Sequence, residues 1–128
     1  MENLDIPATD RSPAVLFDFG QNQLRVSGES YPEDVSTFYH SIFKALDAYL
    51  ANLGKGHCRF QFELIYFNSS SAKAIMMLME KLDEAAKSGA SVEIYWFYDE
   101  EDDTMKELGE EFGEDLEHAV FHLEKMTV

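Results

Sequence analysis

The chain has 128 residues, a length typical of one domain with a single hydrophobic core. Hydrophobic residues make up 45% of it and aromatic residues 13%, which excludes intrinsic disorder along the whole chain. The 25 acidic residues outnumber the 10 lysine and arginine residues, for a formal net charge of -15, so we expect a surface that repels nucleic acids and anionic membranes.

Cysteine content and the amino terminus indicate the compartment. The only cysteine, Cys58, excludes an internal disulfide and any site built from several cysteines, which suits a reducing environment. The first residues, 1–5, lack the basic stretch and apolar run of a secretory signal, and the apolar runs 75–79 and 94–98 are too short to span a bilayer. We therefore expect a cytoplasmic protein with no membrane insertion.

The first third of the chain predicts an arm, a hairpin and a helix. Residues 1–12 show little periodicity and form the N-terminal arm, whereas residues 14–27 contain two short strands around the turn residues 20–22, which predicts an antiparallel hairpin. Ser30 is a candidate cap for a helix that ends at Gly54. Its apolar stripe recurs at steps of three and four residues: Val35, Phe38, Ile42, Leu46, Tyr49 and Leu53.

The rest of the chain alternates strands with helices. Residues 57–67 and 91–98 have the patterns of strands, and a helix over 72–87 connects them. Its predicted apolar face contains Ala72, Ile75, Met76, Met79, Leu82 and Ala86. A helical segment within 99–117 and a strand over 119–123 complete the order ββαβαβαβ. Because this alternation requires crossover connections, we predict an α/β fold, a mixed sheet with helices packed against it, in which strands 57–67 and 91–98 are parallel neighbours.

Four histidines and one cysteine raise the question of metal binding or catalysis. His118 and His122 are four residues apart, but the segment resembles a strand and contains no zinc-protease motif. His57 and Cys58, adjacent on a strand, point to opposite faces and cannot act as base and nucleophile. We expect no metal, no cofactor and no catalysis. The competing interpretation is a small-ligand-binding domain or an enzyme with a pocket near the strand ends.

The segment from Asp99 to Glu117 contains 11 acids and one base, Lys106. A solvated helix face that maintains solubility is the ordinary interpretation. The functional interpretation is a docking surface for a basic partner. Calcium binding is disfavoured, because no EF-hand loop with its glycine is present around Asp99 to Asp103.

A run of three serines, Ser69 to Ser71, lies where a buried strand ends and a helix begins. Backbone N–H groups are unsatisfied at such a position, and the helix dipole is positive there. Helix capping alone, contributing about 1 kcal/mol, explains serines of this kind. A serine there is also suited to phosphorylation, because the N–H groups of the helix can donate hydrogen bonds to the phosphate and Lys73 can pair with it. The phosphate would add about -1.5 to -2 charge, which a partner docked on that helix would experience directly.

Four segments support a family resemblance when they occur together and in this order: Thr9 with Ser12-Pro13; Gly28-Glu29-Ser30-Tyr31-Pro32-Glu33; Tyr66-Phe67-Asn68-Ser69-Ser70-Ser71; and Trp96-Phe97-Tyr98-Asp99 followed by Met105-Lys106-Glu107-Leu108-Gly109-Glu110. With them, nearly the whole chain resembles the SiaC family of bacterial regulatory phosphoproteins, whose members are similar to STAS-type anti-sigma factor antagonists. The resemblance implies a single STAS-like domain over residues 1–128.

The resemblance also implies a switch in which the unmodified protein binds and stimulates a diguanylate cyclase, raising cyclic di-GMP and controlling biofilm formation and aggregation. The phosphorylated residue is then Ser69, ahead of Ser70 and Ser71, where family members can have threonine. The implied partners are a SiaB-type serine/threonine kinase, a SiaA-type phosphatase and a SiaD-type diguanylate cyclase. The residues expected to bind a partner are Asn68, Ser70, Ser71, Lys73, Tyr98 and Asp99. Antagonism of an anti-sigma factor in a partner-switching cascade is the alternative.

Overall fold

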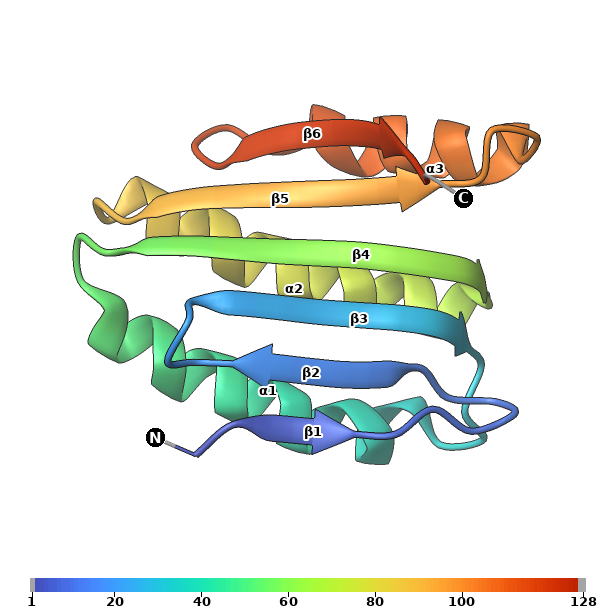
Figure 1. Ribbon diagram of the computed structural model, residues 1–128, viewed down its shortest axis with the longest axis horizontal. Coiled ribbons are helices and arrows are strands. Elements are labelled where there is room, and N and C mark those ends of the chain that lie inside the picture. The colour runs from blue at the N-terminus through green and yellow to red at the C-terminus, as the bar shows by residue number, and fades with distance from the viewer. Residues whose placement is uncertain (1, 127–128) are drawn as a thin grey trace.

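The computed structural model describes residues 2–126, which form a six-stranded mixed sheet with three helices (Figure 1). The elements are β1 (Leu4–Ile6), β2 (Ala14–Asp18), β3 (Gln23–Ser30), α1 (Val35–Leu53), β4 (His57–Phe67), α2 (Ser69–Lys87), β5 (Ser91–Tyr98), α3 (Asp103–Glu114) and β6 (Val120–Lys125). The strands lie in the sheet in chain order, from β1 to β6. This arrangement confirms the predicted mixed α/β fold, and it adds one short strand, β1, inside the predicted arm.

The pairing of the strands agrees with the prediction where one was made. Strands β2 and β3 form the antiparallel hairpin, and β4 and β5 are parallel neighbours. Strand β1 pairs antiparallel with β2, whereas β3–β4 and β5–β6 are parallel. The hairpin turn is closed by Asn22, whose φ of 55° lies in the left-handed region that asparagine tolerates.

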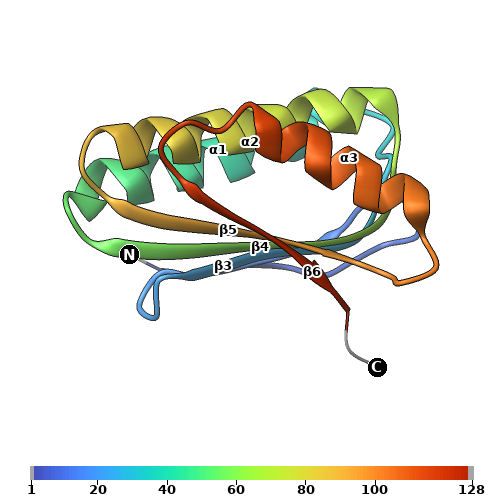
Figure 2. The ribbon, with the colours of Figure 1, turned by 90° about the horizontal axis from the view of Figure 1, so that it is seen from above.

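All three helices lie on the same face of the sheet (Figure 2). Each helix connects one strand to the parallel strand beside it, and right-handed crossovers that progress in one direction place their helices on one side. The core between the layers is closed by large, fully buried side chains that include Trp96, Phe60, Phe62, Leu46 and Leu78. Among residues 2–126, no helix is both long enough and apolar enough to pass through a bilayer.

Helix α1 begins with a different cap from the predicted one. Asp34 is its N-cap, and the Asp34 carboxylate accepts a hydrogen bond from the backbone N–H of Thr37 at 3.0 Å. Ser30 instead ends β3, where it lies opposite Phe67 of β4 and is fully buried. The strand extends this far because a shift of register after Gly28 keeps β3 paired with β4 to their ends.

Helix α2 corrects one member of the predicted apolar face. Met76 is 43% exposed, whereas Ile75, Leu78, Met79 and Leu82 are buried. A stripe at this spacing occupies only one side of a helix, and Met76 lies one residue beyond it. The prediction that Met76 belongs to the apolar face was therefore wrong, and this side chain lies on the outer surface of α2.

Helix α3 is anchored to the sheet through Trp96 of β5. The Trp96 indole N–H donates a hydrogen bond to the backbone carbonyl of Met105 at 3.0 Å. The ring of Phe112 also packs against Trp96, with centroids 5.4 Å apart. Close approach is possible because Gly109 faces the indole, where a Cβ atom would lie only 2.4 Å from Trp96 Cδ1.

We predict that Gly109→Ala destabilises the protein, although glycine to alanine inside a helix ordinarily stabilises by up to about 1 kcal/mol. The added methyl group collides with Trp96, and such overpacking costs about 1–3 kcal/mol. The measurement is the free energy of unfolding in denaturant. The matched control is Gly20→Ala in the hairpin turn, where the nearest heavy atom to a new Cβ is 3.7 Å away. Equal stability of the two variants would contradict the proposed contact.

Candidate functional site

The serine run lies at the edge of the sheet where the parallel strands end. Strands β3, β4 and β5 run in one direction, so their carboxyl ends at Ser30, Phe67 and Tyr98 lie at the same edge (Figure 1). A single residue, Asn68, separates β4 from α2. The Asn68 backbone N–H donates to the carbonyl of Ser30 at 3.2 Å, which ties the junction to β3.

Asn68 is also the N-cap of α2. Its side-chain carbonyl oxygen accepts a hydrogen bond from the backbone N–H of Ser71 at 2.9 Å, and its backbone carbonyl accepts one from the N–H of Ala72 at 2.9 Å. The capping role considered for the serine run is therefore filled by Asn68, and Ser69 is the first residue of the helix. The cap does not depend on the hydroxyl group of Ser69.

The three serines have different environments. Ser69 and Ser70 are exposed, whereas Ser71 has 0% exposure. The hydroxyl of Ser71 accepts a hydrogen bond from the hydroxyl of Ser30 at 2.9 Å. An enzyme that modifies the folded protein can reach Ser69 and Ser70, but it cannot reach Ser71 without opening the junction.

A buried network of three hydroxyl groups supports the start of α2. The Ser30 hydroxyl lies 2.7 Å from that of Tyr39 in α1. Because Ser30 uses its one proton toward Ser71, Tyr39 is the donor in its bond with Ser30. Burial raises the pKa of the Tyr39 phenol, so the group stays protonated and able to donate. The network joins β3, α1 and α2 immediately beneath the exposed serines.

The outer surface of α2 combines polar and apolar side chains next to the serines. Lys73 is exposed and lies four residues after Ser69, so the two share one side of the helix. Met76 and Met77, 43% and 45% exposed, continue this side. Methionine side chains of this kind are common at adaptable protein-binding surfaces. We call Ser69, Lys73, Met76 and Met77 the outer face of α2.

A cavity of about 430 Å³ lies between the N-terminal halves of α1 and α2, beside the outer face of α2. Its lining includes Tyr39, Phe43, Ser70, Lys73, Ala74 and Met77. Two acidic residues at the start of α1, Glu33 and Asp34, line the same cavity. Ser70 therefore shares this cavity with two carboxylates, whereas Ser69 does not line it.

The remaining predicted partner-binding residues lie at the end of β5. Tyr98 is only 6% exposed, so its side chain belongs to the core beneath this edge and not to the surface. Asp99 is exposed, and its carboxylate accepts a hydrogen bond from the backbone N–H of Glu101 at 2.9 Å. Of this pair, only Asp99 presents a side chain that a partner can contact.

The structure gives no support to His57 and Cys58 as the base and nucleophile of an enzyme. Cys58 is buried, and burial raises the pKa of its thiol to about 11, so it is not a thiolate nucleophile near neutral pH. His57 is exposed on the opposite face of β4, as the sequence predicted. Within residues 2–126, no group of three or more histidine, cysteine, aspartate or glutamate side chains has an arrangement that could hold a metal ion.

Sequence reasoning missed a cluster on the face of the sheet that no helix covers. The Glu93 carboxylate lies 3.3 Å from the ring nitrogens of His57 and His122 and 3.8 Å from the guanidinium of Arg59. Tyr95 stacks on His122, with ring centroids 4.3 Å apart. The histidines come from strands β4 and β6, so only the sheet register brings them together.

Comparison with known proteins gives concordant matches. A model of the SiaC family, described as regulatory phosphoproteins, matches residues 6–126. An uncharacterised protein of Pseudomonas aeruginosa strain UCBPP-PA14 is 35% identical over 115 residues, which cover 90% of each chain. The crystal structure of apo-SiaC from Pseudomonas aeruginosa, 33% identical, has a TM-score of 0.90 and covers 97% of this chain and 99% of its own.

A second solved structure from Pseudomonas aeruginosa contains a similar chain in a complex. It is the crystal structure of the diguanylate cyclase SiaD with its activator SiaC. The match has a TM-score of 0.90 at 32% identity and covers 96% of this chain and 99% of the other. The similarity therefore extends over nearly the full length of each protein.

We predict that Tyr39→Phe lowers the free energy of unfolding by about 1–2 kcal/mol, because Ser30 loses a buried hydrogen-bond donor. Chemical denaturation measures the change. The control is Tyr31→Phe, at a half-buried tyrosine that packs edge-on against Tyr66 and for which we expect a change within about 0.5 kcal/mol. If Tyr39→Phe is as stable as the parent protein, the hydroxyl network does not support the junction.

Proposed function

Because this chain belongs to the SiaC family of regulatory phosphoproteins, we propose that it is a non-catalytic binding protein controlled by phosphorylation of Ser69. The family resemblance carried by its sequence motifs is confirmed by the family match and the solved structures. The observation that supports the choice of residue is the environment of Ser69. It is exposed at the start of α2, while Asn68 caps the helix and Ser71 is buried.

Electrostatics favours Ser69 over Ser70. A phosphate on Ser69 shares one side of α2 with Lys73, and helix α2 has no acidic residue in its first turn to oppose it. A phosphate on Ser70 would enter the cavity that Lys73 lines together with two acids, Glu33 and Asp34, so repulsion by the carboxylates would oppose the attraction of the one base. Both serines are accessible, so local charge is the feature that distinguishes them.

The proposed partner is a diguanylate cyclase of the SiaD type. The support is the complex of SiaD with its activator SiaC, whose fold this chain shares at a TM-score of 0.90. A SiaB-type kinase would then add the phosphate, and a SiaA-type phosphatase would remove it. Antagonism of an anti-sigma factor, the alternative from sequence, would use the same serine, but the solved complex favours the cyclase.

We place the docking surface on the outer face of α2, with Asp99 at its margin. The exposed methionines Met76 and Met77 would contribute apolar contact, and Lys73 would contribute charge. Asn68 and Ser71 would act from beneath by holding the first turn in place. Tyr98 would contribute through packing in the core.

Phosphorylation would act by excluding the partner and not by unfolding this protein. A helix N-terminus stabilises an anion by about 0.3–1 kcal/mol, so the isolated fold tolerates the phosphate. Burying the same phosphate against a partner surface shaped for a hydroxyl leaves a poorly solvated charge. A cost of about 4 kcal/mol would weaken binding about a thousandfold.

We predict that Ser69→Ala abolishes phosphorylation by the cognate kinase and keeps cyclase activation, because the small side chain leaves the docking surface uncharged. Ser69→Asp should weaken cyclase binding without lowering thermal stability, since it introduces one charge at a position that tolerates anions. Intact mass after incubation with kinase and ATP measures the first effect. Titration of the cyclase and thermal melting measure the second.

The control for these variants is Ser70→Ala, which alters the other exposed serine and should be phosphorylated like the parent protein. Undiminished labelling of Ser69→Ala would show that Ser69 is not the acceptor. If Ser69→Asp binds the cyclase with unchanged affinity, or loses binding only because it unfolds, exclusion by charge is not the mechanism.

A further inference from the structure

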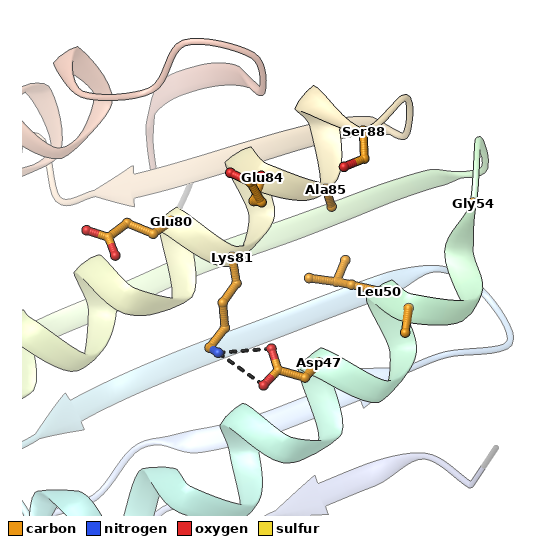
Figure 3. A pocket seen from close by; sticks show the side chains of 9 residues that line it. Asp47, Leu50, Gly54, Glu80, Lys81, Glu84, Ala85 and Ser88 are labelled. Carbon is orange, nitrogen blue, oxygen red and sulfur yellow. Dashed lines mark hydrogen bonds and ion pairs between the residues drawn. The ribbon is translucent and has the colours of Figure 1, made fainter.

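A second groove separates the C-terminal halves of α1 and α2, away from the serine run (Figure 3). It has a volume of about 640 Å³. Leu50 of α1 and Ala85 of α2 face one another across it (Figure 3), and Ala51 adds to the apolar lining. The groove is hollow because several lining residues are small: Ala51 and Ala85, with Gly54 and Ser88 at its far end.

The rim of this groove has a negative charge that the protein neutralises only in part. Asp47, Glu80 and Glu84 line the groove together with one base, Lys81. The Lys81 ammonium binds both carboxylate oxygens of Asp47, at 2.9 and 3.1 Å (Figure 3). Glu80 and Glu84 line the rim and are exposed, so their carboxylates are accessible to a partner.

The helix dipoles add little to this negative charge. Helices α1 and α2 both end beside the groove, at Leu53 and Lys87. The C-terminus of a helix has a partial negative charge that favours cations. Helix α1 has no basic residue in its last turn, whereas α2 has Lys87 there and Lys55 follows the C-cap of α1, so the dipoles add little and the negative charge of the groove comes mainly from its carboxylates.

We propose that this groove, which we call the α1–α2 groove, docks a cationic amphipathic segment of a protein partner. An apolar side chain of the segment packs against Leu50, Ala51 and Ala85, and lysine or arginine residues on either side pair with Glu80 and Glu84. The segment needs both its apolar side chain and its positive charge. An apolar ligand would gain nothing from the acidic rim, and a purely polar cation would leave the apolar lining exposed to water.

The α1–α2 groove is independent of the switch at Ser69. Glu80 and Ser88 follow Ser69 by 11 and 19 residues along α2, which corresponds to about 16 and 28 Å along the helix. Charges on the surface are screened beyond about 8 Å at physiological ionic strength. Phosphorylation therefore leaves the affinity of this groove nearly unchanged, and a partner can hold this end of α2 in either state of the switch.

The test uses the full-length protein and a labelled peptide of leucine and lysine in an amphipathic pattern, with binding followed by fluorescence anisotropy. The charge reversal Glu80→Lys with Glu84→Lys should weaken binding about tenfold or more. The control reverses Glu110→Lys with Glu114→Lys in α3, a pair with the same spacing and the same change of net charge, and it should change binding less than about twofold. A peptide with serine in place of leucine should bind at least about tenfold more weakly.

Nuclear magnetic resonance of the parent protein locates the peptide and does not depend on how the variants fold. Shifts that cluster at Leu50, Ala51 and Ala85 support the proposal. Equal weakening by the two charge reversals, shifts spread over α3, or equal binding of the serine peptide would each overturn it, because the peptide then responds to net charge only. Ser69→Asp should bind the peptide as the parent does, so failure of the Ser69 switch and failure of this groove are distinguishable.

Discussion

The parallel pairing of β3, β4 and β5 is the constraint on which the rest of the structure depends. Parallel strands need crossovers, and right-handed crossovers in one direction bring every helix to one face of the sheet. The same geometry aligns the carboxyl ends of the strands at one edge, where Ser30 meets Asn68. The site, the cavity beside it and the α1–α2 groove all follow from placing α1 and α2 side by side.

Within that frame, neighbouring polar residues have separate roles. Asn68 caps α2, Ser71 is bound within the buried hydroxyl network, and Ser69 remains free at the surface. This separation lets a surface residue be modified while the hydrogen bonds that hold the helix stay intact. The proposed phosphorylation of Ser69 would therefore change the charge of the outer face of α2 and leave these hydrogen bonds in place.

Much of the fold was predictable because hydrophobic periodicity is a local property. The stripe from Val35 to Leu53 and its stop at Gly54 located the body and the C-terminal end of α1, and alternation placed β4 at residues 57–67. Strand β1 was missed because three residues are too few to show a period. The cap of α1 was wrong because Ser30, a good capping residue in isolation, is held in β3 by its pairing with β4.

By itself the sequence determined the order of the elements, the position of the serine run between a strand and a helix, and the family resemblance. The first two depend on residues close together in the chain, and the third depends on four short segments that occur in a given order. Only the tertiary structure decided which serine is accessible, because Ser71 is covered through a bond with Ser30, 41 residues away. Likewise, the pairing of Asp47 with Lys81 across the α1–α2 groove joins residues 34 apart. Periodicity reveals which side of an element is apolar, but only the packing of elements decides which polar groups are buried together.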